Sequence, residues 1–424
     1  MKIFEPKLIE ACKSYSKKQF VDDLVAGIIV AIIALPLSIA LAIASGVSPE
    51  KGLYTAIIAG FVIALLGGSR VNISGPTAAF ATIVAGIVAE HGVSGLALAT
   101  IMAGMILVLM GIFRLGTLIK YIPESITVGF TSGIAVTIVI GQIKDFLGLT
   151  FAEGTHAVES MEKLSAIAAS ISTINGWALL IGLLGLVILI TWPRVSKKIP
   201  GSLVAVIILT AMVLFTGINV NTIGDLYTIS SALPTFAIPE ITVEKITALI
   251  PSAFTIAILA AIESLLSCVV SDRMIDDKHN SNTELIAQGV GNICSALFGG
   301  IPATGAIART AANVKNGGRS PISAIVHAVV LLVVLVLLMP YAAWIPMPVI
   351  AAVLFIVAYN MSEWRHFLSI CKEAPKNETL VLVLTFILTV VFDLVVAICV
   401  GLAVHYLIVI IKKISNRNKG KSAL

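Results

Sequence analysis

Charged residues are scarce in this sequence: Asp, Glu, Lys and Arg make up 12% of its 424 residues, whereas hydrophobic residues make up 58%. A soluble domain usually contains about 25% charged residues. The mean hydropathy is +1.05, and apolar stretches of about 20 residues, long enough to cross a bilayer, recur from end to end. No region has the composition of a sizeable soluble domain. The composition therefore excludes a soluble protein and predicts one integral membrane domain.

The residue patterns of enzymes and metal sites are also missing. The five cysteines are scattered and show neither disulfide nor metal-ligand spacing. The histidines form no ligand constellation, no paired carboxylates or nucleophile–base pair stand out, and the glycine-rich segments lack the Lys-Ser/Thr ending of a phosphate loop. We therefore predict a protein that is not an enzyme and that uses no cofactor or metal. The N-terminus lacks the short apolar region and cleavage site of a signal peptide, so we expect no cleaved leader.

Two segments at membrane depth are too short and too interrupted to be ordinary spans. In Ser69–Phe80 a short extended run leads into Gly75-Pro76, and a helix is expected to start there. In Phe298–Asn313 a helix is broken by three glycines and a proline, Gly299, Gly300, Gly305 and Pro302, and a helical pattern resumes only at about Thr304. Non-helical backbone inside a bilayer is tolerated only where it is buried or lines a water-filled cavity. A helix that begins there points free N–H groups and a positive dipole end into the cavity, which attracts anions.

The two interrupted segments occupy matching places in two halves of the chain. Pro76 and Ala303 are roughly 227 residues apart, and so are the starts of the first and eighth long spans, near Asp23 and Ile250. Such pairing is typical of a transporter with a central site. We predict fourteen transmembrane segments, seven in each half, with the second half inverted because seven is odd. The first span is expected to be broken at Pro36.

The distribution of positive charge supports this topology. With the N-terminus inside, the cytoplasmic side receives 23 Lys and Arg residues and the outer side only four, Lys51, Lys144, Lys163 and Lys245. Residues 1–20 are predicted to form an amphipathic cytoplasmic leader, 21–413 the transmembrane transport domain with repeats at about 21–219 and 244–413, and 414–424 a basic cytoplasmic tail. The net charge of +5 is thus explained by topology, and we predict no nucleic-acid partner.

Glu263 is the first functional candidate, because an ionisable group deep in a span costs roughly 2.5–3.5 kcal/mol on insertion scales. It could gain and lose a proton and so couple protons to an anion, or it could form a static ion pair with Arg309. Arg309 is the one Arg or Lys that cannot be assigned to a loop; it could be a fixed cation at the site or point at helix carbonyls. Hydroxyls of Thr77, Thr304 and Ser267 could bind an oxyanion or bond their own helices.

These segments carry a family resemblance that covers essentially the whole chain. The matching motifs are Asp23–Gly27, Ala34–Pro36, Gly52–Tyr54, Ser74–Ala78, Ile122–Glu124 with Gly129–Phe130, and Gly305–Asn313. Together they resemble the SulP (sulfate permease) anion transporter family. Three further motifs, Ile262–Leu266, Glu284–Gly289 and Asn360–Glu363, are especially similar to its bacterial C4-dicarboxylate branch.

The resemblance implies the fold shared with uracil permeases, an all-α polytopic membrane protein with a 7+7 inverted repeat and two half-helices preceded by short strands. It implies a core domain and a gate domain, an elevator-like motion, a homodimer, and a place in the bacterial plasma membrane with both termini cytoplasmic. Members usually carry a cytoplasmic STAS domain after the last span, and the printed sequence, which ends at Leu424, holds none. By motif position, the resemblance implies a substrate pocket of Leu37, Leu41, Thr77, Ala78, Glu263, Ser267, Ala306, Ile307, Ala308 and Arg309.

The predicted function is therefore secondary active transport of a small inorganic or carboxylate anion. The transporter itself is expected to be surrounded by membrane lipid. Proton-coupled uptake of a C4-dicarboxylate is the first expectation. Bicarbonate or sulfate transport, driven by protons or sodium, and an anion channel or non-transporting scaffold are the alternatives. Sodium-coupled bicarbonate relatives carry Asp at the Glu263 position, so Glu favours H⁺ over Na⁺ as the coupling ion.

Overall fold

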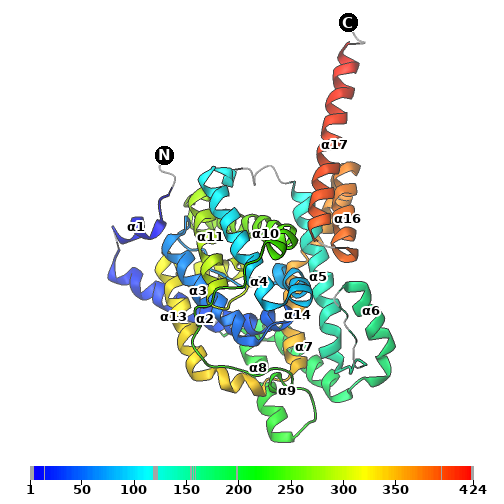
Figure 1. The fold of residues 1–424 in the computed structure, drawn as a ribbon. Helices are drawn as coiled ribbons and strands as arrows, with labels where there is room; N and C mark the ends of the chain where they lie inside the picture. Colours follow the sequence, from blue (N-terminus) through cyan, green and yellow to red (C-terminus); the bar gives the residue numbers. More distant parts are fainter. Residues whose placement is uncertain are drawn as a thin grey trace.

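A computed structural model describes residues 4–13, 15–117, 123–152, 155, 157, 159–196, 199–392 and 394–421. The described chain is mostly helical, with one two-stranded sheet (Figure 1). Eight of the described helical segments are long and apolar enough to cross a membrane, and Gly201–Thr216 and Val396–Ile411 are shorter apolar helices. Helix α11 (Ser281–Leu297) has 17 residues and is not among them; Glu284, Gln288 and Asn292 line one of its faces, and all three are fully buried.

The two strands join the interrupted segments. Strand β1 (Ser74–Gly75) pairs antiparallel with β2 (Thr304–Gly305), with Ser74 opposite Gly305 and Gly75 opposite Thr304. The amide of Ala306 extends the ladder by donating to the Ile73 carbonyl at 2.8 Å. The predicted short strands are thus confirmed, and the pairing brings together segments that lie more than 200 residues apart in the sequence.

A helix follows each strand. Thr77 is the extended N-cap residue of a 3₁₀ turn, η1 (Ala78–Phe80), which continues into α4 (Ala81–Ile112). Within α4, Gly92 has φ 67° and ψ −177° and breaks the helix between the third and fourth predicted spans. Only glycine adopts this conformation without strain. After β2 comes the short helix α12 (Ile307–Lys315).

The helices pack in two groups. The strand group contains β1, β2, α12 and the helices around them: α2 (Lys17–Ala44), α3 (Pro49–Leu66), α4, α10 (Val243–Ile275), α11 and α13 (Pro321–Leu338). The flanking group contains α5 (Glu124–Leu147), α7 (Gly176–Val195), α8 (Gly201–Thr216), α14 (Met347–Met361), α16 (Lys376–Val391) and α17 (Leu394–Lys421). In Figure 1, α5, α16 and α17 stand together on one side and α2, α3, α11 and α13 on the other. Short helices connect these elements: α6 (Ser160–Ala169), η3 (Ile171–Thr173), α9 (Ile223–Leu226), η4 (Met339–Trp344) and α15 (Trp364–Glu373).

Glycines allow a close contact between α4 and α11 in the strand group. A Cβ atom on Gly104 of α4 would lie 2.6 Å from the Gly289 carbonyl oxygen of α11, and one on Gly289 would lie 2.5 Å from the Gly104 carbonyl oxygen. Small residues let helix backbones approach in this way inside membranes, where packing rather than water exclusion holds helices together. The α4–α11 pair therefore fixes the helix that follows β1 against the helix that precedes β2.

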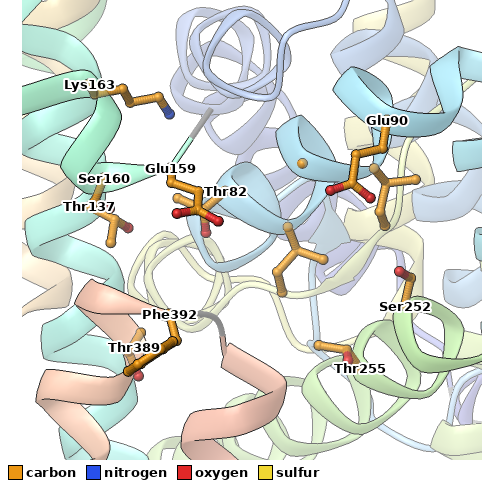
Figure 2. A pocket seen from close by; sticks show the side chains of 13 residues that line it. Thr82, Glu90, Thr137, Glu159, Ser160, Lys163, Ser252, Thr255, Thr389 and Phe392 are labelled. Atoms are coloured by element: carbon orange, nitrogen blue, oxygen red, sulfur yellow. The ribbon is translucent and has the colours of Figure 1, made fainter. Parts of the chain in front are cut away.

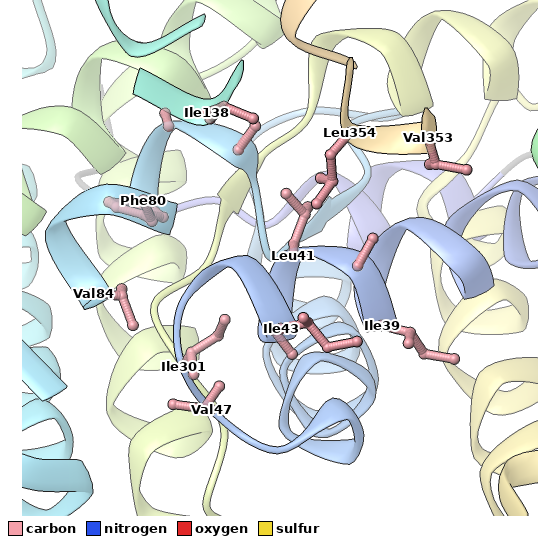
Figure 3. Close-up of a cluster of buried hydrophobic side chains, with 14 of the residues drawn as sticks. Ile39, Leu41, Ile43, Val47, Phe80, Val84, Ile138, Ile301, Val353 and Leu354 are labelled. Atoms are coloured by element: carbon pink, nitrogen blue, oxygen red, sulfur yellow. The ribbon is translucent and has the colours of Figure 1, made fainter. Parts of the chain in front are cut away.

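An apolar cluster joins the two groups. Figure 3 shows Ile39, Leu41 and Ile43 of α2 near Phe80 at the end of η1 and Leu354 of α14. Helix α2 runs unbroken from Lys17 to Ala44 with Pro36 inside it, so the expected break at Pro36 is wrong. Proline removes one backbone hydrogen bond from a helix, and buried contacts around Pro36 keep the remaining turns in place.

The N-terminal residues dock on the connecting loops of the strand group. Helix α1 (Lys7–Cys12) begins where the Lys7 amide donates to the Gly67 carbonyl at 2.9 Å. Lys7 and Arg70 both form ion pairs with Glu10 and Asp277. The structure thus ties the predicted leader to the loops that enter β1 and α11.

Candidate functional site

The tip of α12 presents free backbone donors. It has no side-chain cap, Ile307 in its first turn is 41% exposed, and Ala308 is also exposed. The first N–H groups of a helix have no partner within the helix and carry its positive dipole end. Ile307 and Ala308, two of the predicted pocket residues, therefore form an accessible surface suited to an anion, whereas the amide of the predicted pocket residue Ala306 is engaged by the Ile73 carbonyl.

Glu263 and Thr77 are brought together from the two halves. The Thr77 hydroxyl donates to Glu263 Oε2 at 3.0 Å, which links the residue after β1 to the middle of α10. Both side chains are half-buried. A carboxylate that solvent reaches, next to a hydroxyl at a helix start, can exchange a proton or orient a neighbouring ligand.

Arg309 lies across the end of β1. Its side chain is 2% exposed, and Nη2 donates to the Pro76 carbonyl. Its Nε and Nη1 have no hydrogen-bond partner among the described residues, so the static ion pair with Glu263, one of the alternatives above, is not formed. A Cβ on Gly75 would lie 2.7 Å from Nη1, so Gly75 is required for the guanidinium to sit there. The buried cation is left with unused donors close to both strands.

Ser267 has structural partners. It is fully buried and donates to Asn72 Oδ1 at 2.8 Å. Thr310 Oγ1 contacts the same oxygen at 3.1 Å and accepts from the Ile73 amide at 3.0 Å. These bonds connect α10, the residues before β1 and α12. The assignment of Ser267 to the substrate pocket stays a prediction.

Glu284 is a residue of this region that the sequence reasoning quoted only as part of a motif. It is fully buried, and its carboxylate accepts from Asn72 Nδ2 at 2.8 Å, Gly68 N at 2.9 Å, Gln288 Nε2 at 3.0 Å and Ser264 Oγ at 3.4 Å. Buried charges persist where hydrogen bonds satisfy them. The signal that could have found it is the recurrence of polar residues every four positions in an otherwise membrane-embedded helix.

The chain before β2 is held by the same helix. Asn292 donates through Nδ2 to the Ala303 carbonyl and accepts from the Ala303 amide, both at 2.8 Å. The Thr304 hydroxyl donates to the Ala260 carbonyl at 3.0 Å and is buried, so it is engaged with α10. Glu284 and Asn292 thus fix the approach to both strands.

The remaining predicted pocket residues are apolar. Leu37 is half-buried, whereas Leu41 is 2% and Ala78 is 8% exposed. Leu41 belongs to the apolar cluster in Figure 3. The structure therefore brings Thr77, Glu263, Arg309 and the start of α12 around the paired strands, and it places Leu41 and Ser267 in packing positions beside them.

Comparisons with known proteins agree with this architecture. The model of the sulfate permease family matches residues 20–385. A putative sulfate transporter, YvdB of Bacillus subtilis, is 45% identical over 93% of this chain and 74% of its own length. The bicarbonate transporter BicA of Picosynechococcus is 33% identical over 94% of this chain and 71% of its own.

Solved structures show the same fold. The transmembrane domain of a cyanobacterial bicarbonate transporter BicA superposes with a TM-score of 0.82 at 30% identity, over 91% of this chain and 98% of that domain. SLC26A9 superposes with a TM-score of 0.85 at 20% identity, over 97% of this chain and 68% of that chain, which is evidence for the fold alone. The predicted fold class, a helical membrane protein with two inverted repeats of seven segments, is confirmed.

Proposed function

Because the chain belongs to the sulfate permease family of anion transporters, we propose that it is a secondary active transporter that binds a small oxyanion between η1 and α12 and moves it together with a proton. That the protein is a multi-pass membrane transporter and not an enzyme follows from the family. The observation that carries the finer proposal is the antiparallel pairing of β1 with β2, which places two helix starts beside one another.

Anion recognition rests on donors that the fold leaves unused. The open first turn of α12 supplies backbone N–H groups, and Arg309 adds a buried positive charge whose Nε and Nη1 are unpaired in the described structure. Fixed donors in a low-dielectric site hold an anion more strongly than the same groups would in water. Backbone N–H groups and a guanidinium bind small oxyanions in general, so these donors support a small oxyanion as the class of ligand.

Glu263 supports proton coupling. Its carboxylate is half-buried, holds the Thr77 hydroxyl, and makes no ion pair with Arg309. Protonation of Glu263 would remove a negative charge beside the site and favour anion binding, so proton and anion would bind together. Na⁺ coupling is the second candidate, and no described group of three or more His, Cys, Asp or Glu side chains could hold a metal ion.

The two packing groups fit an elevator-type motion. The strand group would act as the moving core and the flanking group as the gate, with the apolar cluster of Figure 3 as the sliding contact. The exposed apolar faces of α7 and α8 would contact membrane lipid; Val187 and Phe215 on these faces are 56% and 92% exposed. The proposal also includes assembly as a homodimer.

The substrate has three candidates. C4-dicarboxylate uptake stays a prediction from the three motifs of that branch, and the names of YvdB and BicA favour sulfate and bicarbonate as alternatives. Uptake of labelled succinate, sulfate and bicarbonate into proteoliposomes, with an imposed pH gradient and with Na⁺ replaced by choline, separates these substrates and the two coupling ions. Saturation and counterflow distinguish a transporter from a channel.

The coupling role has a matched control on the same helix. Glu263→Gln should remove the dependence of uptake on the pH gradient, whereas Glu244→Gln, an exposed residue in the first turn of α10, should leave it unchanged. If Glu263→Gln keeps both the rate and the pH dependence of the wild type, the proton does not travel through this carboxylate.

A further inference from the structure

Two of the four lysines on the predicted outer face form no ion pair with a described residue; Asp145 adjoins Lys144 and Glu162 adjoins Lys163 in the sequence, and each carboxylate interacts with its lysine only through the longer-range field. Lys51 donates to the Gly299 carbonyl at 3.2 Å, and Lys245 pairs with Glu240. Lys144 and Lys163 form neither an ion pair nor a hydrogen bond with any described residue. An ammonium group without an acceptor is available to a mobile anion.

Lys144 and Lys163 line one cavity of about 190 Å³, on the helices α5 and α6. The Lys163 Nζ lies 4.0 Å from the position that a Cβ on Gly141 would take, and Gly141 is about one turn before Lys144 on α5. The other described lining residues are uncharged and include Phe151 and Thr155. The two ammonium groups therefore face a shared space that no described carboxylate lines.

The surroundings hold both lysines without neutralising them. Lys144 Nζ lies 4.9 Å from the centre of the Phe151 ring, a cation–π contact that orients the chain and leaves its charge unpaired. Burial lowers the pKa of Lys163, and the neighbouring Glu162 opposes this effect only in part. A bound anion would stabilise the charged form that burial disfavours.

Lys163 also lines a larger cavity of about 280 Å³ between the two helix groups. Figure 2 shows Lys163 and Thr137 on one side of it and Glu90, Ser252 and Thr255 on the other. Thr82 and Glu90 lie on α4 and Thr255 on α10. On the same helices, Thr255 lies eight residues before Glu263, about two turns, and Thr82 lies five residues after Thr77. The part of the larger cavity lined by Thr255 thus lies about two turns of α10 from Glu263.

We propose that Lys144 and Lys163 form an outer anion-binding site that captures the oxyanion, and that Lys163 passes it through the larger cavity toward η1 and α12. This proposal rests on anion transport by the chain. Glu90 and Glu159 line the larger cavity and Lys163 is its only described cation, so Lys163 is the described group there that attracts an anion, and the two carboxylates raise the energy of its passage. The ligand is a small oxyanion of the transported class.

The test measures initial uptake of the transported anion at low ionic strength, with Lys144→Gln and Lys163→Gln singly and together. One unit charge about 7 Å from an anion in water changes binding roughly threefold for a monovalent anion such as bicarbonate and roughly sevenfold for a divalent one such as sulfate or succinate. We expect each variant to raise KM by about that factor and the pair to raise it by about the square of that factor, with the maximal rate unchanged and KM restored in Lys163→Arg. Lys245→Gln removes a paired lysine outside both cavities and should keep the wild-type KM.

A variant that removes a negative charge should shift KM in the opposite direction, which tests whether the effect of the lysines on KM is electrostatic. Glu90→Gln removes a negative charge from the passage and should lower KM. The proposal is overturned if the lysine variants keep the wild-type KM, or if they lower the maximal rate at constant KM. Failure of the wild-type chain to take up succinate, sulfate or bicarbonate would instead refute the proposed transport function.

Discussion

Replacing Glu284 by glutamine tests whether the buried polar network holds the paired strands in place. Glutamine has nearly the same shape but only one acceptor oxygen. With that oxygen on Asn72 Nδ2, Gln288 Nε2 and Ser264 Oγ, the new NH₂ group must face the Gly68 amide, which now donates to Glu284 Oε2 at 2.9 Å. Two donors then oppose each other in a site with no exposure.

The magnitude follows from the loss of one charge-assisted bond and the burial of an unsatisfied donor. The bond contributes about 1.5–3 kcal/mol and the orphaned donor costs about 1–3 kcal/mol, so Glu284→Gln should destabilise the fold by roughly 3–5 kcal/mol. This loss is measured as a lower midpoint of thermal unfolding of the purified protein in detergent. Size-exclusion chromatography monitors the fraction of protein that remains folded at each temperature. Glu244→Gln, the exposed control on α10, should unfold like the wild type. A Glu284→Gln midpoint equal to that of the wild type would refute the reasoning.

Three further predictions concern Gly75 at the end of β1, the contact between α4 and α11, and the N-terminal helix α1. Gly75→Ala should abolish uptake while the protein still folds, because the added Cβ would lie 2.7 Å from Arg309 Nη1; normal uptake would show that the guanidinium can sit elsewhere. Gly289→Leu should lower the unfolding midpoint strongly, because even a Cβ there lies 2.5 Å from the Gly104 carbonyl, whereas Gly86→Leu, with open space around it, should not. The hydrogen bonds of Glu10 with Lys7 and Arg70 lower the pKa of that carboxyl below 4.5. Its contribution to docking is therefore complete at neutral pH and is lost as the pH falls through the lowered folded value. Proteolysis of the N-terminal helix α1 should accelerate as the pH falls below the ordinary carboxyl value of 4.5 and through the lowered folded value, and a rate that does not change with pH would contradict this assignment.

The sequence predicted the two interrupted segments well because glycine and proline act locally. Gly75-Pro76 and the segment from Gly299 to Gly305 combine glycine with proline and therefore disfavour a helix, and the repeated offset links the two breaks. The spans expected to begin near Asp23 and Ile250 are helices that begin earlier, at Lys17 and Val243, because hydrophobic length marks the membrane-spanning part of a helix and misses its polar first turns.

Long-range partners could not be predicted in the same way. Nothing near Ser267 in the chain indicates that its hydroxyl bonds Asn72, and nothing near Arg309 indicates that it reaches the Pro76 carbonyl. The alternative of a static Glu263–Arg309 ion pair is not formed, because the Arg309 guanidinium turns toward β1 and donates to the Pro76 carbonyl. The role of Glu284 was missed because its partners Asn72 and Gly68 lie more than 200 residues away. The error at Pro36 has the opposite origin: a local helix-breaking signal was overridden by packing.

The central claim is that the helix starts beside β1 and β2 bind the transported anion. Ala308→Cys in a background without the five natural cysteines places a thiol in the exposed first turn of α12, where its reaction with a water-soluble thiol reagent can be timed. We predict that the thiol reacts and that the transported anion slows the reaction several-fold at concentrations near its KM. A thiol that does not react, or that reacts at the same rate with and without the anion, would contradict the site described here.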